Sequence, residues 1–135
     1  MFPAGRPWNW SGSVNRLFQL AAITLFLAGC AERKPKSLGQ PFDGTPVAIA
    51  TLAGTRSPES SNMSARVVLH GRMTQKCPVA GCWFMLHDET GTIKVDTKNA
   101  GFVVVDIPLQ SSIVVAGYLM TNGAEKIIDA TGLRY

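Results

Sequence analysis

The chain has 135 residues with 13 basic and 9 acidic side chains, which gives a formal net charge of +4 at pH 7. This length suits one small domain. Two of the arginines, Arg6 and Arg16, lie at or before the start of an apolar N-terminal segment, and the remainder carries 11 basic against 9 acidic residues. Because the remainder is near neutral and has no basic run, nucleic acid is not an expected partner.

The apolar segment is LFQLAAITLFLAG, residues 17–29. It is shorter than the roughly 20 residues that a spanning helix needs, and it is typical of a signal peptide, here residues 1–29. Together with Cys30 the segment ends in Leu-Ala-Gly-Cys, which resembles the lipobox of bacterial lipoproteins. The resemblance implies that Cys30 is acylated, for example with palmitate, and anchors the mature protein in a membrane. Since Ala31 follows rather than an aspartate, the expected location is the periplasmic side of the outer membrane.

The next residues, 30–40, are polar and include Pro35, which predicts a flexible tether. The domain proper is then expected to span residues 41–135. Within it, TPVAIATLA (45–53) fits a short strand or a brief helix, and the Ser-rich stretch 53–65 is expected to be a loop.

The rest of the chain carries β signals and no useful helical periodicity. Gly71 lies inside the first expected strand and predicts a bulge or a bend. Gly91 marks a turn, and the Asn122-Gly123 pair predicts a tight hairpin. The predicted strands are residues 66–75, 82–88, 92–97, 112–120 and 125–135.

Three short hairpins and one long connection, residues 98–111, join these five strands. A closed sheet removes the exposed edges of an open one, so the expected fold is all-β, a small five-stranded barrel. The strand plan is that of an OB-fold.

A longer pattern supports this fold, with Cys-x4-Cys-Trp at its centre. The chain resembles an uncharacterised family of small exported bacterial OB-like domains, for which no activity is established. Where that pattern has an acidic-aromatic pair, this chain has Asn99-Ala100. The residues that carry the resemblance are Gly71, Cys77, Gly81, Cys82, Trp83, Leu86, Phe102 and Gly117.

Cys77 and Cys82 are expected at the two ends of the first hairpin loop, directly opposite each other. This register would pair Arg72 with His87, Met73 with Leu86 and Gln75 with Phe84. Opposed cysteines favour a structural disulfide, which would stabilise the domain by about 2 kcal/mol for so short a loop.

Two other interpretations of the cysteines stay open. A thiol site for copper(I) or zinc is one, although zinc usually needs four ligands and Cys30 is assigned to lipid. A redox-active dithiol that serves envelope proteins is the other, although Cys-x-x-Cys spacing and a helix N-terminus are missing. No cofactor is otherwise expected.

The same register divides the first two strands into two faces. One face is the expected core, with Leu69, Met73, Phe84, Leu86 and both cysteines. The other is solvated, and the third strand could extend it through Lys94 and Asp96. Its residues are His70, Arg72, Lys76, Trp83, Met85, His87 and Glu89.

This solvated face is the candidate ligand site, because OB-folds bind ligands on the second and third strands and the adjoining loops. An exposed Trp83 beside Arg72 and His87 would suit stacking on a sugar or another ring. Alternatively, Trp83 is packed under the connection 98–111 and the histidines are surface residues. No catalytic constellation is present, and Asp88 and Glu89 are expected to cap a turn. The predicted function is that of a lipid-anchored envelope module that binds a small ligand or an envelope protein.

Overall fold

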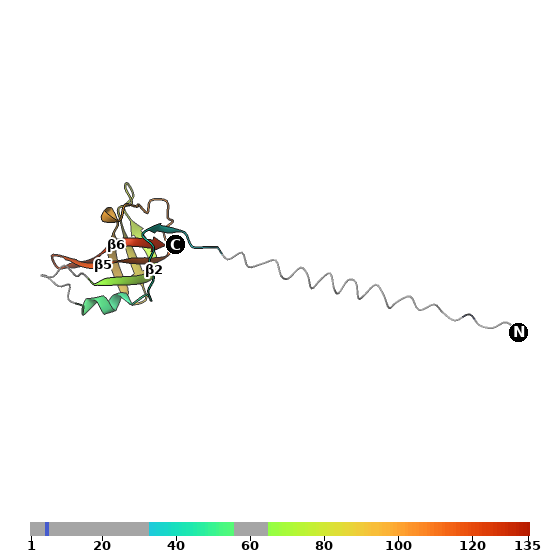
Figure 1. Ribbon diagram of the computed structural model, residues 1–135, viewed down its shortest axis with the longest axis horizontal. Coiled ribbons are helices and arrows are strands. Elements are labelled where there is room, and N and C mark those ends of the chain that lie inside the picture. The colour runs from blue at the N-terminus through green and yellow to red at the C-terminus, as the bar shows by residue number, and fades with distance from the viewer. Residues whose placement is uncertain (1–4, 6–32, 56–64) are drawn as a thin grey trace. The chain divides into compact units, whose positions relative to one another are not determined.

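The computed structural model describes residue 5 and residues 33–55 and 65–135 (Figure 1). Apart from Gly5, the predicted signal peptide therefore lies outside the described residues, as do Cys30 and much of the Ser-rich stretch. Residues Pro35–Tyr135 form one compact unit. None of the helices in the described part of the chain combines the length and the apolar character that a membrane span requires.

The unit is a closed barrel of five strands in the order β2-β3-β4-β6-β5, with β5 returning to β2. Neighbouring strands are antiparallel except β4 and β6, which run parallel. This is the OB-fold plan, so the predicted fold class is confirmed. The strands of the barrel are β2 (Arg66–Lys76), β3 (Trp83–Asp88), β4 (Gly91–Asp96), β5 (Ser112–Asn122) and β6 (Glu125–Arg134).

Three short elements complete the unit. Strand β1 (Ser37–Gly39) pairs with the end of β6, outside the closed ring. Part of the segment predicted as tether thus belongs to the folded unit, because its backbone pairs with the end of β6. The ambiguous segment contains a 3₁₀ helix, η2 (Ile49–Ala53), and a second 3₁₀ helix, η3 (Lys98–Ala100), begins the long connection.

The register between β2 and β3 follows the prediction only as far as Met73. Arg72 pairs with His87 and Met73 with Leu86, but a bulge at Thr74 shifts the ladder by one residue. The predicted pairing of Gln75 with Phe84 is therefore wrong, since Gln75 pairs with Met85 and Lys76 with Phe84.

The bulge also changes the positions of the residues that come after Thr74. The N–H of Cys77 donates to the carbonyl of Trp83 at 3.0 Å, so Cys77 lies opposite Trp83 rather than Cys82. Lys76 leaves the predicted solvated face, and its Nζ donates to carbonyls of the connection 98–111.

The bulge predicted near Gly71 thus lies three residues further along the strand. Gly71 has a different reason to be a glycine: a Cβ at this position would overlap the carbonyl oxygen of His87. The backbones of β2 and β3 lie too close together there to leave room for a side chain at residue 71.

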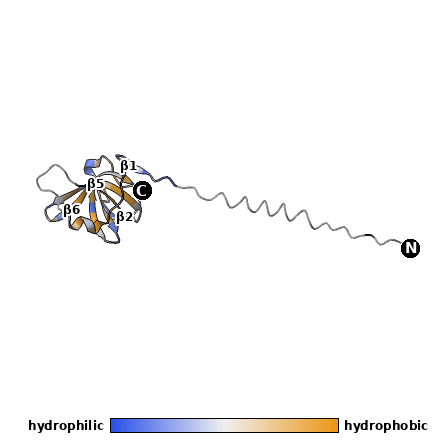
Figure 2. Ribbon diagram, turned by 60° about the horizontal axis from the view of Figure 1, so that its bottom comes forward, coloured by the Kyte–Doolittle hydropathy of each residue, from blue (hydrophilic) through white to orange (hydrophobic). Residues whose placement is uncertain are grey.

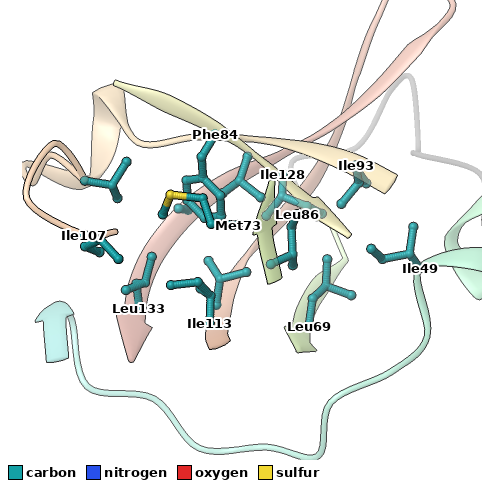
Figure 3. Packing of buried hydrophobic residues seen from close by; sticks show 14 of the residues in the cluster. Ile49, Leu69, Met73, Phe84, Leu86, Ile93, Ile107, Ile113, Ile128 and Leu133 are labelled. Carbon is teal, nitrogen blue, oxygen red and sulfur yellow. The ribbon is translucent and has the colours of Figure 1, made fainter. Parts of the chain in front are cut away.

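The barrel interior is a single hydrophobic cluster (Figure 3). Hydrophobic residues recur along its strands (Figure 2), and alternate ones point inward. Four residues predicted for the core, Leu69, Met73, Phe84 and Leu86, have no solvent exposure. Ile49 of η2 packs on the same cluster. The core therefore fixes β2 and β3, and it sets which of their side chains point outward.

Candidate functional site

A cleft of about 500 Å³ lies on the outside of β2 and β3, beside the segment Pro46–Ala48. This segment is held against the barrel because Val47 donates its N–H to the carbonyl of Val68 at 2.9 Å. The cleft brings together four residues of the predicted ligand face, the basic or imidazole side chains of His70, Arg72 and His87 and the acidic Glu89. Its lining comprises Pro46, Val47, Ala48, His70, Gly71, Arg72, His87, Asp88, Glu89, Thr90 and Ser112.

The backbone register explains why the side chains of His70, Arg72 and His87 meet. Arg72 is paired with His87 on β3 and with Ser112 on β5, and directly opposed residues in a sheet have neighbouring side chains. His70 lies two residues before Arg72 and therefore points to the same side of β2. All three side chains are exposed.

Each of these side chains is oriented by one hydrogen bond. His70 Nε2 lies 2.9 Å from Ser112 Oγ, and His87 Nδ1 lies 2.9 Å from Thr92 Oγ1. The Nη1 of Arg72 donates to the Gln110 carbonyl at 3.1 Å. A guanidinium has five N–H donors, and each imidazole has a second ring nitrogen, so all three retain capacity for a ligand.

Of the two acidic residues that line the cleft, Asp88 and Glu89, Asp88 has a structural role. The Asp88 carboxylate accepts the N–H groups of Ile49, Thr90 and Gly91, at 2.8, 2.7 and 2.9 Å, and the Thr90 hydroxyl at 2.6 Å. Its partial burial raises the pKa, but these hydrogen bonds outweigh burial and the pKa of Asp88 is lowered. Asp88 ties the β3–β4 turn to η2, which confirms that it caps a turn.

The other predicted ligand residues form a second group on the same side of the sheet. Trp83, Met85 and His87 alternate along β3, and Lys94 of β4 pairs with Met85. Lys94 Nζ lies 5.4 Å from the centre of the Trp83 ring, a cation–π contact. We call the outer row Trp83, Met85 and His87, with Lys94, the aromatic strip.

The aromatic strip does not line the cleft except through His87. Trp83, Met85 and Lys94 are half-buried. In the described part of the chain, the side chains that pack on the core cluster include Ala100 and Phe102 of the long connection but neither Trp83 nor Met85. The aromatic strip therefore belongs to the outer surface of the barrel.

Cys77 and Cys82 are half-buried free thiols. Hydrogen bonds from the backbone of Ala80 and Val79 lower the pKa of Cys77 to about 7, against a smaller opposing effect of burial, and the Cys82 side chain adds to the lowering. No residue pattern indicates this environment, because it depends on the loop backbone. Among the residues that the structure describes, no three His, Cys, Asp or Glu side chains are grouped to hold a metal ion.

Two features of the site were missed by sequence reasoning. The segment Pro46–Ala48 forms one wall, and Ser112 and Gln110 position His70 and Arg72. All lie far from β2 in the sequence, and no local pattern identifies such contacts.

No family model matches the sequence, and no curated protein matches it. A solved structure that is similar is that of the hypothetical protein ygiW from E. coli. The match has a TM-score of 0.51 and 14% sequence identity, and it covers 68% of this chain and 91% of that chain. At this identity the likeness concerns the fold, and it agrees with a small OB-like barrel.

Proposed function

We propose that the protein is a binding module of the cell envelope, and that its ligand carries a ring and an anionic group, as an acidic oligosaccharide does. The observation that carries this proposal is the cleft in which His70, Arg72 and His87 converge. His87 belongs both to this cleft and to the aromatic strip, so the two groups form one continuous surface.

The dimensions suit an elongated ligand. His87 is four positions after Trp83 on an extended strand, which corresponds to roughly 13 Å. That length exceeds one sugar ring and matches a short chain of rings. A ring stacked near Trp83 would place a neighbouring unit at the cleft.

The chemistry of the two ends is different. Arg72 can bind a carboxylate or phosphate through two parallel N–H donors, which are stronger than neutral hydrogen bonds. Trp83 offers a half-buried apolar ring, and the charge of Lys94 lies over this ring. OB-folds bind oligosaccharides and oligonucleotides on the second and third strands of the barrel, which are β3 and β4 here and carry the aromatic strip.

The proposal is tested by calorimetric titration with oligogalacturonate, an acidic sugar chain, and with maltooligosaccharide as the neutral counterpart. We expect binding of the acidic chain only, and loss of at least tenfold in affinity for Arg72→Ala and for Trp83→Ala. Matched controls are Arg66→Ala and Tyr118→Ala, whose side chains are exposed and which pair with each other across β2 and β5.

Equal losses in the control variants would contradict the proposed face, and so would equal affinity for the neutral chain. Thermal unfolding of each variant separates lost binding from lost folding.

The lipid anchor on Cys30 is part of the same proposal and rests on the lipobox resemblance. Expression with radiolabelled palmitate should label the wild-type protein and not Cys30→Ser. Fractionation should then recover the wild-type protein with the outer membrane. Labelling of both proteins, or of neither, would contradict the anchor.

A further inference from the structure

The loop between Cys77 and Cys82 is held in shape by main-chain hydrogen bonds. Gly81 donates its N–H to the Cys77 carbonyl at 3.2 Å, and Cys77 donates to Trp83 at 3.0 Å. The carbonyl of Cys82 accepts from Thr97 at 2.9 Å. Because these bonds secure both ends of the loop, its conformation does not depend on a covalent link between the sulfurs.

A second set of bonds ties the loop to the long connection. The Gly81 carbonyl accepts the N–H of Val104 at 3.0 Å and the hydroxyl of Thr97 at 3.3 Å. Gly81 has φ +57°, and a Cβ there would lie 2.6 Å from the N of Val105. The loop is thus a firm support for the two thiols, and a bond between them can form and break with little change in the fold.

The environment of the Cys77 sulfur favours a thiolate. Hydrogen bonds from the backbone of Ala80, Val79 and Gly81, together with one from the Cys82 side chain, lower the pKa of Cys77 to about 7. Successive backbone N–H groups that converge on one atom form an anion-binding concavity. Both sulfurs are also partly exposed, so a reagent in solution can reach them.

We propose that Cys77 and Cys82 are a redox-active dithiol that reduces a disulfide of a partner protein, with Cys77 as the attacking residue. The Cys77 thiolate attacks one sulfur of the partner disulfide, forms a mixed disulfide and releases the other partner sulfur as a thiolate, which takes up a proton. Cys82 then loses its proton and attacks the Cys77 sulfur. The Cys77–Cys82 bond forms, the second partner thiol leaves, and two electrons have passed to the partner.

The surroundings favour a protein over a small disulfide. Val79, between the two cysteines, is 89% exposed, and Val105, which contacts Gly81 through its backbone, is 39% exposed. The Val79 side chain, in the loop that carries the thiols, can pack against a polypeptide. Glutathione disulfide, which is small and charged, would gain little from this contact.

The first test compares the single thiols at pH 7 with glutathione disulfide as the probe. In Cys82→Ser, Cys77 should react several-fold faster than Cys82 does in Cys77→Ser. The reason is that hydrogen bonds lower the pKa of Cys77 to about 7, so that about half of this residue is thiolate at pH 7. Equal rates, or a faster Cys82, would overturn the assignment of Cys77 as the attacking residue.

The second test uses the wild-type protein, which removes any dependence on variant folding. After reaction with glutathione disulfide it should release all glutathione and hold an internal Cys77–Cys82 disulfide. Glutathione retained as a stable mixed disulfide would overturn the role of Cys82.

The third test addresses the partner class with insulin as a protein disulfide. The Val79→Ser variant should reduce insulin several-fold more slowly than the wild-type protein and reduce glutathione disulfide at the same rate. An equal effect on both substrates, or on neither, would overturn the preference for a protein.

Discussion

The strongest stability prediction concerns Lys76, the residue that the Thr74 bulge turns toward the long connection. Its Nζ donates to the carbonyls of Val105 at 2.6 Å and Ile107 at 2.5 Å, with Val104 at 3.5 Å as a weaker third acceptor. Lys76 thereby binds a connection that contains no strand. Replacement by methionine keeps the aliphatic chain and removes the charge.

Hydrogen bonds to a charged group contribute about 1.5–3 kcal/mol each. Lys76 makes two short hydrogen bonds, to Val105 and Ile107. The bond to Val105 is exposed, so water can replace it and its loss costs less. We therefore expect Lys76→Met to lower the free energy of unfolding by about 2–3 kcal/mol. For a domain of this size that corresponds to a melting temperature about 10 °C lower or more.

The matched control is Lys98→Met. The Lys98 side chain is 65% exposed and lies 3.6 Å from Asp96, so its loss should cost less than about 1 kcal/mol. Urea unfolding followed by circular dichroism measures both. Equal values for the two variants would refute the claim that Lys76 secures the connection.

Two further predictions concern single positions in the barrel. Gly71→Ala places a Cβ against the His87 carbonyl and should destabilise the protein by about 1–3 kcal/mol. In the control Gly54→Ala the new Cβ meets open space, so stability should change by less than about 0.5 kcal/mol. Thermal unfolding of both variants measures the difference. Folding lowers the pKa of Asp88 below its unfolded value of 3.8. The Asp88 carboxylate therefore stabilises the folded protein fully above pH 3.8, and this stabilisation is lost as the pH falls through the lower folded pKa. The difference in stability between wild type and Asp88→Asn should thus be constant from pH 5 to 7 and shrink below pH 4, and a difference independent of pH would contradict this.

The barrel could be predicted from the sequence because alternation along a strand reports directly on which side is buried. The inward positions of β2 and β3 were identified for that reason. The bulge could not be predicted, since Thr74 and Gln75 are both polar and fit either register on the exposed side. One polar residue therefore decided whether Cys77 faces Cys82 or Trp83.

The candidate site was predicted in part. Local alternation placed His70, Arg72 and His87 on one face, and the structure adds that they share a cleft. The wall formed by Pro46–Ala48 depends on contacts between distant segments. The environment of the Cys77 thiol depends on where three backbone N–H groups point, which residue types do not reveal. Strand β1 was missed because it is three residues long and has one apolar side chain.

The most direct test of the proposed binding surface is nuclear magnetic resonance of the ¹⁵N-labelled protein during titration with oligogalacturonate. We expect the amide signals around His70, Arg72, Trp83, Met85 and His87 to shift together and to saturate at one affinity. Shifts confined to β5 and β6, or no shifts at concentrations that saturate the calorimetric signal, would contradict the ligand face.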